Sequence, residues 1–410
     1  EVPEFPVKLQ ISYIGYKSQE IAVHDTKTIQ VVLREDTETL DEVVVVGYGS
    51  QKKANLTGAV ASVKMDEVIG DRPLVNAAEA LQGTVPGLLV SSNGNDPGQG
   101  KKFQVRGAYS VGIKNDDGSY GNTIEPLVLI DNVEGDIDMI NPEDIESMTI
   151  LTGPSAAALY GSDASNGVIL ITTKKGTVGK VQISYSNSTS FSSPMMMPKF
   201  QNIYGNREGE LGSWGSLMDT PSNFDPSDFF NTGMTEMNGF TLTTGTEQNQ
   251  TYASVSTTNS TGILPNNAYN RYNFSIRNTA KFCDNKLSLD LGAQYIIQNN
   301  KNMVGSGQYF NPLVSLYLFP RGENFQEVQM YERYSEARNL MVQYWPESIF
   351  GTDLDMQNPY WIMNRMQNEL SKRRYMFNAS LKWDITDWVN VTGRVRVDNS
   401  DSDSYEKYYA

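Results

Sequence analysis

Few side chains in this sequence are suited to covalent chemistry. The chain has one histidine, His24, and one cysteine, Cys283. A catalytic nucleophile needs a base within hydrogen-bond reach, and a single distant histidine provides none. A lone cysteine forms neither a disulfide within the chain nor, without a second thiol, a zinc site. We therefore expect a protein that is not an enzyme.

Three acidic or glycine-rich motifs have the composition of binding sites without the required spacing. Asp116-Asp117-Gly118 resembles part of a calcium loop, but the alternating acids and the distal Glu are missing. Residues 153–161 (GPSAAALYG) lack the lysine of a phosphate-binding loop. Glu143 and Asp144 are adjacent on an expected helical turn and are interpreted as surface residues. These motifs predict no metal, nucleotide or other cofactor.

Length, charge and hydropathy narrow the class of protein. The chain has 410 residues, which favours two or three domains. Its net charge of −15 would repel phosphate backbones, so no nucleic-acid partner is expected. No run approaches the ~18 apolar residues of a membrane-spanning helix, whereas a membrane β-barrel stays possible. The chain starts in strand-like sequence without a signal peptide and stops abruptly after a strand, so we expect a piece of a longer protein.

Strict alternation of apolar and polar residues dominates the second half of the chain. Every odd position from Leu287 to Ile297 is apolar, and residues 375–383 and 389–397 repeat the pattern. This period of two predicts strands with one lipid-facing and one water-facing side. Weaker versions bring the count to seven, at residues 181–185, 240–244, 252–256 and 272–276. Short connections (245–250, 283–286, 384–387) alternate with long ones (193–236, 259–269, 300–372), as in an outer-membrane barrel.

Mixed signals precede these strands. Residues 75–82 predict a helix with Asn76 or Asp71 as its N-cap and Gly83 as its stop. Helical turns are expected at 143–146 and 155–160, and strands at 88–90, 103–105, 127–130, 148–151 and 168–173. Residues 58–176 are therefore expected to form a small α+β unit. Near the N-terminus, strands at 7–13, 19–23 and 28–33 predict half of a small β-sandwich.

A run of four valines lies in the segment between those two regions. Asp41 and Glu42 precede the valines, and Gly47-Tyr48-Gly49 follows them. Valine favours extended backbone, so the segment is either a core strand or a detachable strand that pairs with a partner's sheet edge. The spacing alone leaves both interpretations open.

Five motifs in a fixed order resemble one protein family. They are residues 12–19 (SYIGYKSQ), 39–49 (TLDEVVVVGYG), 126–176, 231–237 (NTGMTEM) and 358–363 (NPYWIM). Together they resemble the SusC/RagA-like branch of TonB-dependent outer-membrane transporters over nearly the whole chain. The resemblance implies a mainly β fold, with an α+β plug domain inside an antiparallel transmembrane β-barrel of about 22 strands, about seven of them present here. It divides the chain into part of a carboxypeptidase-regulatory-like β-sandwich (1–34), a linker with the TonB box (35–57), the plug (58–176) and the first barrel strands with their outer loops (177–410).

The resemblance also implies a function and partners. We expect TonB-dependent, energised import of glycans across the Gram-negative outer membrane, with peptide import as the alternative. A signalling receptor or an adhesin without transport is the alternative of another class. The implied partners are TonB with ExbB and ExbD, a SusD-like surface lipoprotein and outer-membrane lipid. Seven strands leave two unpaired edges, so further strands are expected beside residues 179–193 and 389–400.

Site residues follow from the same resemblance. The expected TonB contacts are Asp41, Glu42, Val43, Val44, Val45 and Val46. Ligand contacts are expected in polar plug loops and an aromatic-rich outer loop, at Tyr109, Asn115, Asp116, Tyr120, Tyr309, Trp345 and Trp361. The aromatic residues either stack on sugar faces or pack against the lipoprotein. Arg106 either pairs with acids of the barrel wall or belongs to a surface turn.

Overall fold

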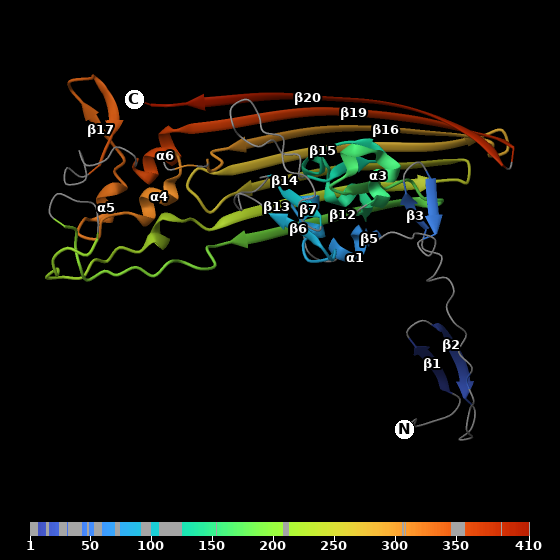
Figure 1. The fold of residues 1–410 in the computed structure, drawn as a ribbon, viewed down its shortest axis with the longest axis horizontal. Coiled ribbons are helices and arrows are strands. Elements are labelled where there is room, and N and C mark those ends of the chain that lie inside the picture. The colour runs from blue at the N-terminus through green and yellow to red at the C-terminus, as the bar shows by residue number, and fades with distance from the viewer. Residues whose placement is uncertain are drawn as a thin grey trace.

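The long strands of the second half of the chain dominate the molecule (Figure 1). The structure, a computed structural model, describes residues 7–13, 16–23, 31, 43–46, 49–52, 60–69, 74–91, 100–105, 125–152, 154–207, 213–305, 307, 309–345, 357–386 and 388–409. Within those ranges no helix is both long and apolar enough to cross a membrane.

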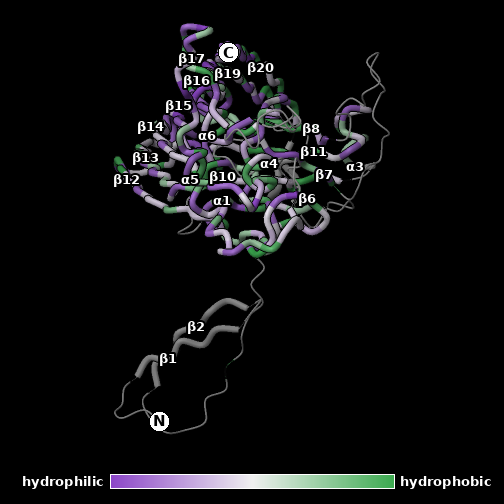
Figure 2. Tube along the Cα trace, turned by 90° about the vertical axis from the view of Figure 1, so that its left-hand side faces the viewer, coloured by the Kyte–Doolittle hydropathy of each residue, from purple (hydrophilic) through white to green (hydrophobic). Residues whose placement is uncertain are grey.

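Seven antiparallel strands form one sheet, which we call the wall. In spatial and chain order they are β12 (Gly179–Ser192), β13 (Gly233–Gly245), β14 (Asn249–Thr261), β15 (Ala268–Phe282), β16 (Leu287–Lys301), β19 (Gln367–Thr386) and β20 (Val389–Lys407). Viewed along the strands, the wall curves around elements that include β8 (Leu127–Ile130), β10 (Ile145–Leu151) and β11 (Val168–Thr173) (Figure 2). The seven strands predicted from alternation are confirmed.

The register of the wall places its apolar residues on the convex face. Leu287 lies opposite Trp383 and Leu289 lies opposite Leu381, so these side chains share one face. Trp383 is 53% exposed and Leu381 is 46% exposed. The alternate residues, including Arg277 and Asp290, face the concave side, where they contact the plug. The predicted outward orientation of the odd-numbered leucines of β16 is confirmed.

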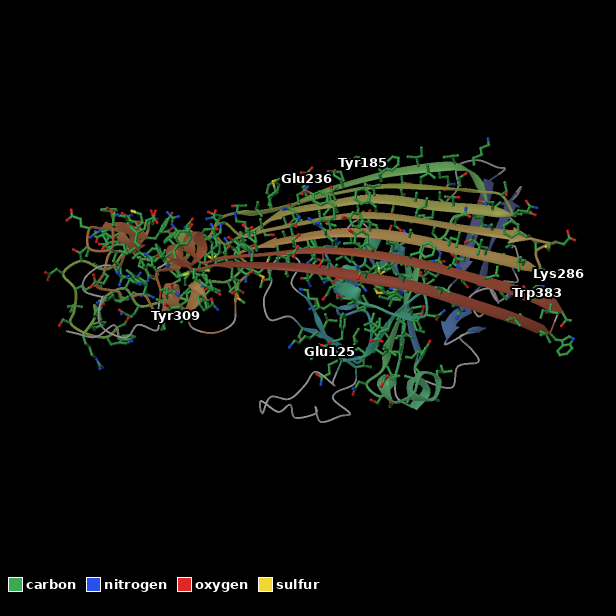
Figure 3. The ribbon with its side chains drawn as sticks, turned by 90° about the horizontal axis from the view of Figure 1, so that it is seen from above. Glu125, Tyr185, Glu236, Lys286, Tyr309 and Trp383 are labelled. Atoms are coloured by element: carbon green, nitrogen blue, oxygen red, sulfur yellow. The ribbon has the colours of Figure 1, made fainter. Side chains whose placement is uncertain are left out.

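The connections alternate in length, with one exception to the prediction. Residues 246–248, 283–286 and 387–388 connect strands at one end, and residues 193–232 and 302–366 form long connections at the other. The predicted long loop at 259–269 is wrong, because β14 and β15 extend further and leave only residues 262–267 between them. Cys283, Asp284 and Asn285 all have positive φ, which confirms the predicted tight turn. Figure 3 shows Lys286 at this end of the wall and Tyr309 beyond the other.

The plug is a five-stranded sheet with helices, in the order β5-β10-β11-β8-β9. Its strands are β5 (Val60–Lys64), β8 (Leu127–Ile130), β9 (Val133–Glu134), β10 (Ile145–Leu151) and β11 (Val168–Thr173). A separate hairpin pairs β6 (Leu88–Ser91) with β7 (Lys102–Val105). The helices are α1 (Met65–Ile69), α2 (Ala77–Leu81) and α3 (Pro154–Tyr160). Apolar residues of these elements form two buried clusters. The larger includes Met65, Leu81, Ile145, Met148 and Ile150, and the smaller packs Ala156 of α3 against Leu129 and Leu170.

Local capping explains how α2 begins and ends. The Ala78 N–H donates to Asn76 Oδ1 over 2.8 Å, which satisfies a backbone group at the helix start. Gly83 follows the helix with φ of +77°, a conformation that glycine adopts without strain. Asn76 is therefore the cap, whereas Asp71 lies outside the described residues. The helical turn predicted at 143–146 needs correction: a 3₁₀ turn covers Pro142–Asp144, and β10 starts at Ile145.

The long connections fold together into an outer unit with its own core. It contains a 3₁₀ turn (Pro226–Phe229), α4 (Pro312–Tyr317), α5 (Phe325–Val328), α6 (Pro359–Arg365) and a hairpin of β17 (Glu332–Ser335) with β18 (Leu340–Gln343). Alternation did not predict these elements. The shared core includes Phe229, Leu316, Phe319, Val328 and Ile362. Asn358 is fully buried and caps α6, which gives the NPYWIM motif a structural role.

Two hairpins lie near the N-terminus. β1 (Val7–Tyr13) pairs with β2 (Tyr16–Val23), and β3 (Val43–Val46) pairs with β4 (Gly49–Lys52). The first two predicted strands are confirmed. The third, at 28–33, lies outside the described residues apart from Val31, so the β-sandwich stays a prediction.

Candidate functional site: the plug–wall interface

An arginine of the wall joins the plug to the barrel strands. Arg277 of β15 donates from Nε and Nη2 to both carboxylate oxygens of Asp290 on β16, over 2.9 and 2.8 Å. Its Nη1 donates to Asp131 Oδ2 of the plug over 3.1 Å and also to Thr173. Asp131 in turn accepts the Thr173 N–H and hydroxyl. A buried guanidinium therefore holds one wall acid and one plug acid at once.

Asp131 is held in place by the turn that carries it. Asp131 and Asn132 both have positive φ, at 47° and 68°, and they connect β8 to β9 in the two-residue turn that suits a hairpin. Aspartate and asparagine tolerate this left-handed region better than most residues. The turn therefore directs the carboxylate toward the wall. The side chain of Arg277 is only 9% exposed, and those of Asp131 and Asp290 are 21% and 17% exposed.

A second contact uses a buried carboxylate without a cation. Asp144 Oδ1 accepts hydrogen bonds from the Tyr252 hydroxyl over 2.9 Å and from the Ser254 hydroxyl over 2.6 Å, both on β14. Among the residues that the structure describes, no lysine or arginine forms an ion pair with it. Burial raises the pKa of Asp144 above its ordinary value, and the hydroxyl hydrogen bonds oppose that shift. This contact is therefore sensitive to pH.

Further contacts extend the interface along the wall. Ser186 of β12 donates to Glu143 over 2.9 Å. Arg396 of β20 donates to the backbone carbonyl of Ile130 over 3.0 Å. Met139, Ile296 and Met376 form a small buried apolar cluster between the two parts. The plug thus contacts both edge strands of the wall, β12 and β20, as well as strands between them.

The convex face carries two aromatic levels with an apolar band between them. One level is a row of directly opposed residues on neighbouring strands, aromatic at every position but Val255: Tyr185, Phe240, Val255, Phe274, Tyr295 and Tyr375. Trp383 lies eight residues further along β19. At ~3.4 Å per residue this is about 27 Å along the strand, or about 21 Å across a membrane for a tilt near 40°. That height is close to the ~25 Å apolar band of an outer-membrane barrel. Figure 3 shows Tyr185 and Trp383 at the two levels.

Half of the predicted site residues lie outside the described part of the chain. These are Asp41, Glu42, Arg106, Tyr109, Asn115, Asp116 and Tyr120. The backbone of residues Val43–Val46 forms a hairpin strand that is not part of the plug sheet. Tyr309 is 48% exposed in the outer unit, whereas Trp345 and Trp361 are 7% and 1% exposed. Trp345 belongs to the core of the outer unit and Trp361 is buried, so their contact with ligand stays a prediction.

Sequence reasoning missed the residues that anchor the plug. Asp131, Arg277 and Asp290 were not predicted as a group, and Asp144 was interpreted as a surface residue. A signal was present for two of them. Arg277 and Asp290 occupy the water-facing positions of strands whose other residues on that face are mostly small or neutral. A charge at such a position indicates a partner inside the barrel.

Comparisons with known proteins place these features in a family. Residues 52–168 match the family described as TonB-dependent Receptor Plug Domain. TonB-dependent receptor SusC of Bacteroides thetaiotaomicron is 34% identical over 309 residues, which cover 71% of this chain and 29% of that protein. TonB-dependent receptor P39 of Formosa agariphila is 34% identical over 287 residues, covering 66% of this chain and 26% of that protein. The chain therefore spans less than a third of the length of these curated relatives.

The comparison with solved structures concerns the fold. The open-open state of the RagAB peptide importer superposes with a TM-score of 0.65 and 21% identity, covering 88% of this chain and 42% of that chain. Its closed-closed state gives a TM-score of 0.64 with 20% identity, covering 85% and 41%. At this identity the likeness shows a shared plug-and-barrel architecture.

Proposed function

Because the chain belongs to the SusC/RagA-like TonB-dependent receptors, we propose that it takes part in the energised import of a solute across the Gram-negative outer membrane. The observation that carries the proposal is a separate α+β plug held against membrane-type strands by a few polar anchors, chiefly Arg277 and Asp144. Hydroxyl and charge-mediated contacts of this kind can be broken and re-formed without unfolding the wall. Import by such a rearrangement needs no covalent step, so the proposed role is not enzymatic.

The energy for import is proposed to come through the valine segment. Residues 41–46 would pair with TonB, which acts with ExbB and ExbD, by adding a strand to its sheet. In the structure the backbone of Val43–Val46 is already extended and pairs only with Gly49–Lys52 among the described strands. A strand in a two-stranded hairpin gives up few contacts when it changes partner.

A substitution in this segment tests the link to TonB. Val45→Pro removes a backbone donor and blocks strand pairing, whereas Val45→Thr keeps a β-branched side chain and the donor. We expect Val45→Pro, like deletion of residues 41–46, to abolish uptake while ligand binding to whole cells persists. Val45→Thr serves as the matched control and should retain uptake. Normal uptake in the deletion strain would exclude this route of energy transfer.

Glycans are the proposed substrates, with peptides as the alternative. Exposed aromatic rings of the outer unit support glycans: Tyr309 and Phe310 are 48% and 40% exposed and pack edge to face. Rings of this kind stack on sugar faces but also bind peptide side chains. Binding of neutral oligosaccharides and of oligopeptides to the full protein, before and after Tyr309→Ala, discriminates between the two. A loss confined to oligosaccharides supports glycan import, and a loss confined to peptides supports the alternative.

A surface lipoprotein of the SusD-like type is the proposed outer partner. The outer unit exposes several large apolar side chains, among them Met195, Met196, Trp214 and Leu217 at 64–88%. Exposed apolar patches mark interaction surfaces. Mass spectrometry of the complex from native membranes should detect the lipoprotein, together with the further strands expected beside β12 and β20. Neither a signalling receptor nor an adhesin would show energised uptake, and an adhesin would not depend on residues 41–46.

A further inference from the structure

The plug packs unequally against the two halves of the wall. On the side of β12–β14, Glu143 and Asp144 contact the strands directly, and a Cβ atom on Gly239 would lie only 2.1 Å from Glu143 Oε2. On the side of β15, β16, β19 and β20, a cavity of about 470 Å³ lies between plug and wall beside their contacts. We call the half from β12 to β14 the close half. The other half also anchors the plug, through Arg277 and Arg396, but it leaves room for a solute beside these contacts.

Charged residues line this cavity, and most of them are cationic. Its plug side is formed by residues 131–133 and 170–172, and its wall side by residues 378–380 and 394–396. Four cationic side chains reach it and two acidic ones do: Lys175, Arg277, Arg394 and Arg396 against Asp131 and Asp290. The cavity thus has more positive than negative charge.

The two acids are already neutralised by their neighbours. Asp131 and Asp290 both pair with Arg277, and Lys175 lies 3.5 Å from Asp290. Arg396 pairs with Asp398 over 3.0 Å, outside the cavity lining. Arg394 is exposed and forms no ion pair or hydrogen bond with any residue that the structure describes. One guanidinium is therefore available to a solute in the cavity.

We propose that this cavity binds a carboxylate group of a solute, with Arg394 as the direct contact. The guanidinium presents parallel N–H donors that match both oxygens of a carboxylate. The inference that this site belongs to an import route rests on the proposed function, whereas the binding of an anion in the cavity does not depend on it. Acidic sugars and acidic peptides both supply the required chemistry.

Thiol labelling measures access and charge preference at the cavity. Cys283→Ser removes the one native thiol, and Ser380→Cys then places a thiol on β19 directly opposite Arg394. The full protein is labelled in outer membranes with an anionic sulfonatoethyl and a cationic trimethylammonium-ethyl methanethiosulfonate. A unit charge about 6 Å away in a water-like dielectric changes the local concentration of a univalent ion about threefold. Arg394→Gln should slow the anionic reagent about threefold and speed the cationic reagent about threefold. We therefore expect the ratio of the anionic to the cationic labelling rate to fall about tenfold.

A matched thiol on the close half provides the control. Ser256 of β14 faces the plug and is 7% exposed, so Ser256→Cys should react at least tenfold more slowly than Ser380→Cys. Arg374→Gln, whose arginine is already paired with Asp398, should leave the rate ratio at Ser380→Cys unchanged. Equal rates at positions 256 and 380, or a ratio unaffected by Arg394→Gln, would overturn the proposal.

Protection from labelling identifies the source of the carboxylate. Millimolar trigalacturonate and triglutamate are compared with neutral maltotriose as competitors of the anionic reagent at Ser380→Cys. Protection by either acidic compound, and not by maltotriose, supports the site and assigns it to sugars or peptides. No protection by either would refute carboxylate binding. Labelling is done in protein lacking residues 41–46, so a failure of the proposed import leaves the result intact.

Discussion

Arg277→Gln is expected to loosen the plug from the wall. The guanidinium makes two hydrogen bonds to Asp290 within the wall, and others to Asp131 and Thr173 of the plug. Only the bonds to the plug resist its displacement. Hydrogen bonds to charged groups contribute about 1.5–3 kcal/mol each, and partial exposure of Asp131 favours the lower end. The loss should be about 3 kcal/mol, or roughly 100-fold in the equilibrium between seated and displaced plug.

Hydrogen–deuterium exchange of the purified full protein measures this equilibrium. The amide of Asp131 donates to Ile171 and the amide of Thr173 donates to Asp131, so peptides covering both report on the anchor. We expect their exchange to accelerate up to about 100-fold in Arg277→Gln. Asp131→Asn removes the same ion pair from the plug side and should accelerate the same peptides, although less because Asn keeps an acceptor.

Arg374→Gln is the matched control for this experiment. Arg374 is as buried as Arg277 and also binds both oxygens of an aspartate, Asp398, but both partners belong to the wall. Its loss should leave exchange of the plug peptides within about twofold of wild type. Wild-type exchange in Arg277→Gln, or equal acceleration in Arg374→Gln, would refute the assignment of Arg277 as an anchor.

Three further perturbations address other parts of the structure. The pKa of Asp144 is raised in the folded state above its ordinary value of 3.8. The contribution of Asp144 to stability is therefore greatest below pH 3.8 and declines as the pH rises through the folded-state pKa. Thermal melts from pH 3.5 to 8 should show this decline, and Asp144→Asn should remove it. Gly176→Ala would place a Cβ atom 2.4 Å from the backbone nitrogen of Thr251, so the plug must shift. We expect unfolding measurements to show a loss of about 1–3 kcal/mol in the free energy of unfolding. Gly393→Ala is the control, because its Cβ atom would meet nothing within 4 Å, and it should cost less than about 1 kcal/mol. Asn358→Ala removes a buried helix cap and leaves the Val328 and Tyr344 carbonyls without their donor. The outer unit should lose about 2–4 kcal/mol of stability, so its proteolysis should accelerate at least tenfold. An unchanged cleavage rate would contradict this role of Asn358.

Alternation of apolar and polar residues predicted the wall strands, because each face of such a strand meets the same surroundings along its length. A wall strand has lipid on one side and the barrel interior on the other, so its sequence alternates wherever it crosses the membrane level. The outward positions of Leu287, Leu289 and Leu291 followed from that alternation alone. The strand ends were harder to place, because beyond the apolar band both faces are polar. β14 and β15 therefore extend several residues past their predicted ends and shorten the loop between them.

The outer unit shows why long connections resist the same reasoning. Its helices have four to seven residues, too few to show a helical period in the sequence. Their stability comes from packing between the two long connections, as when Phe224 contacts Phe319 and Phe325. Trp361, predicted to meet ligand, is buried in this unit. Which aromatic rings face solvent depended on contacts between segments far apart in sequence.

By itself, then, the sequence determined the period of the wall strands and the α+β character of the plug. Each of these depends on residues close together in the chain or on composition. Only the tertiary structure decided which charges meet. Asp131, Arg277 and Asp290 come from three elements, and the first two are 146 residues apart. A buried ion pair requires that the plug fold, the wall curve and the two come into register, so no local pattern specifies it.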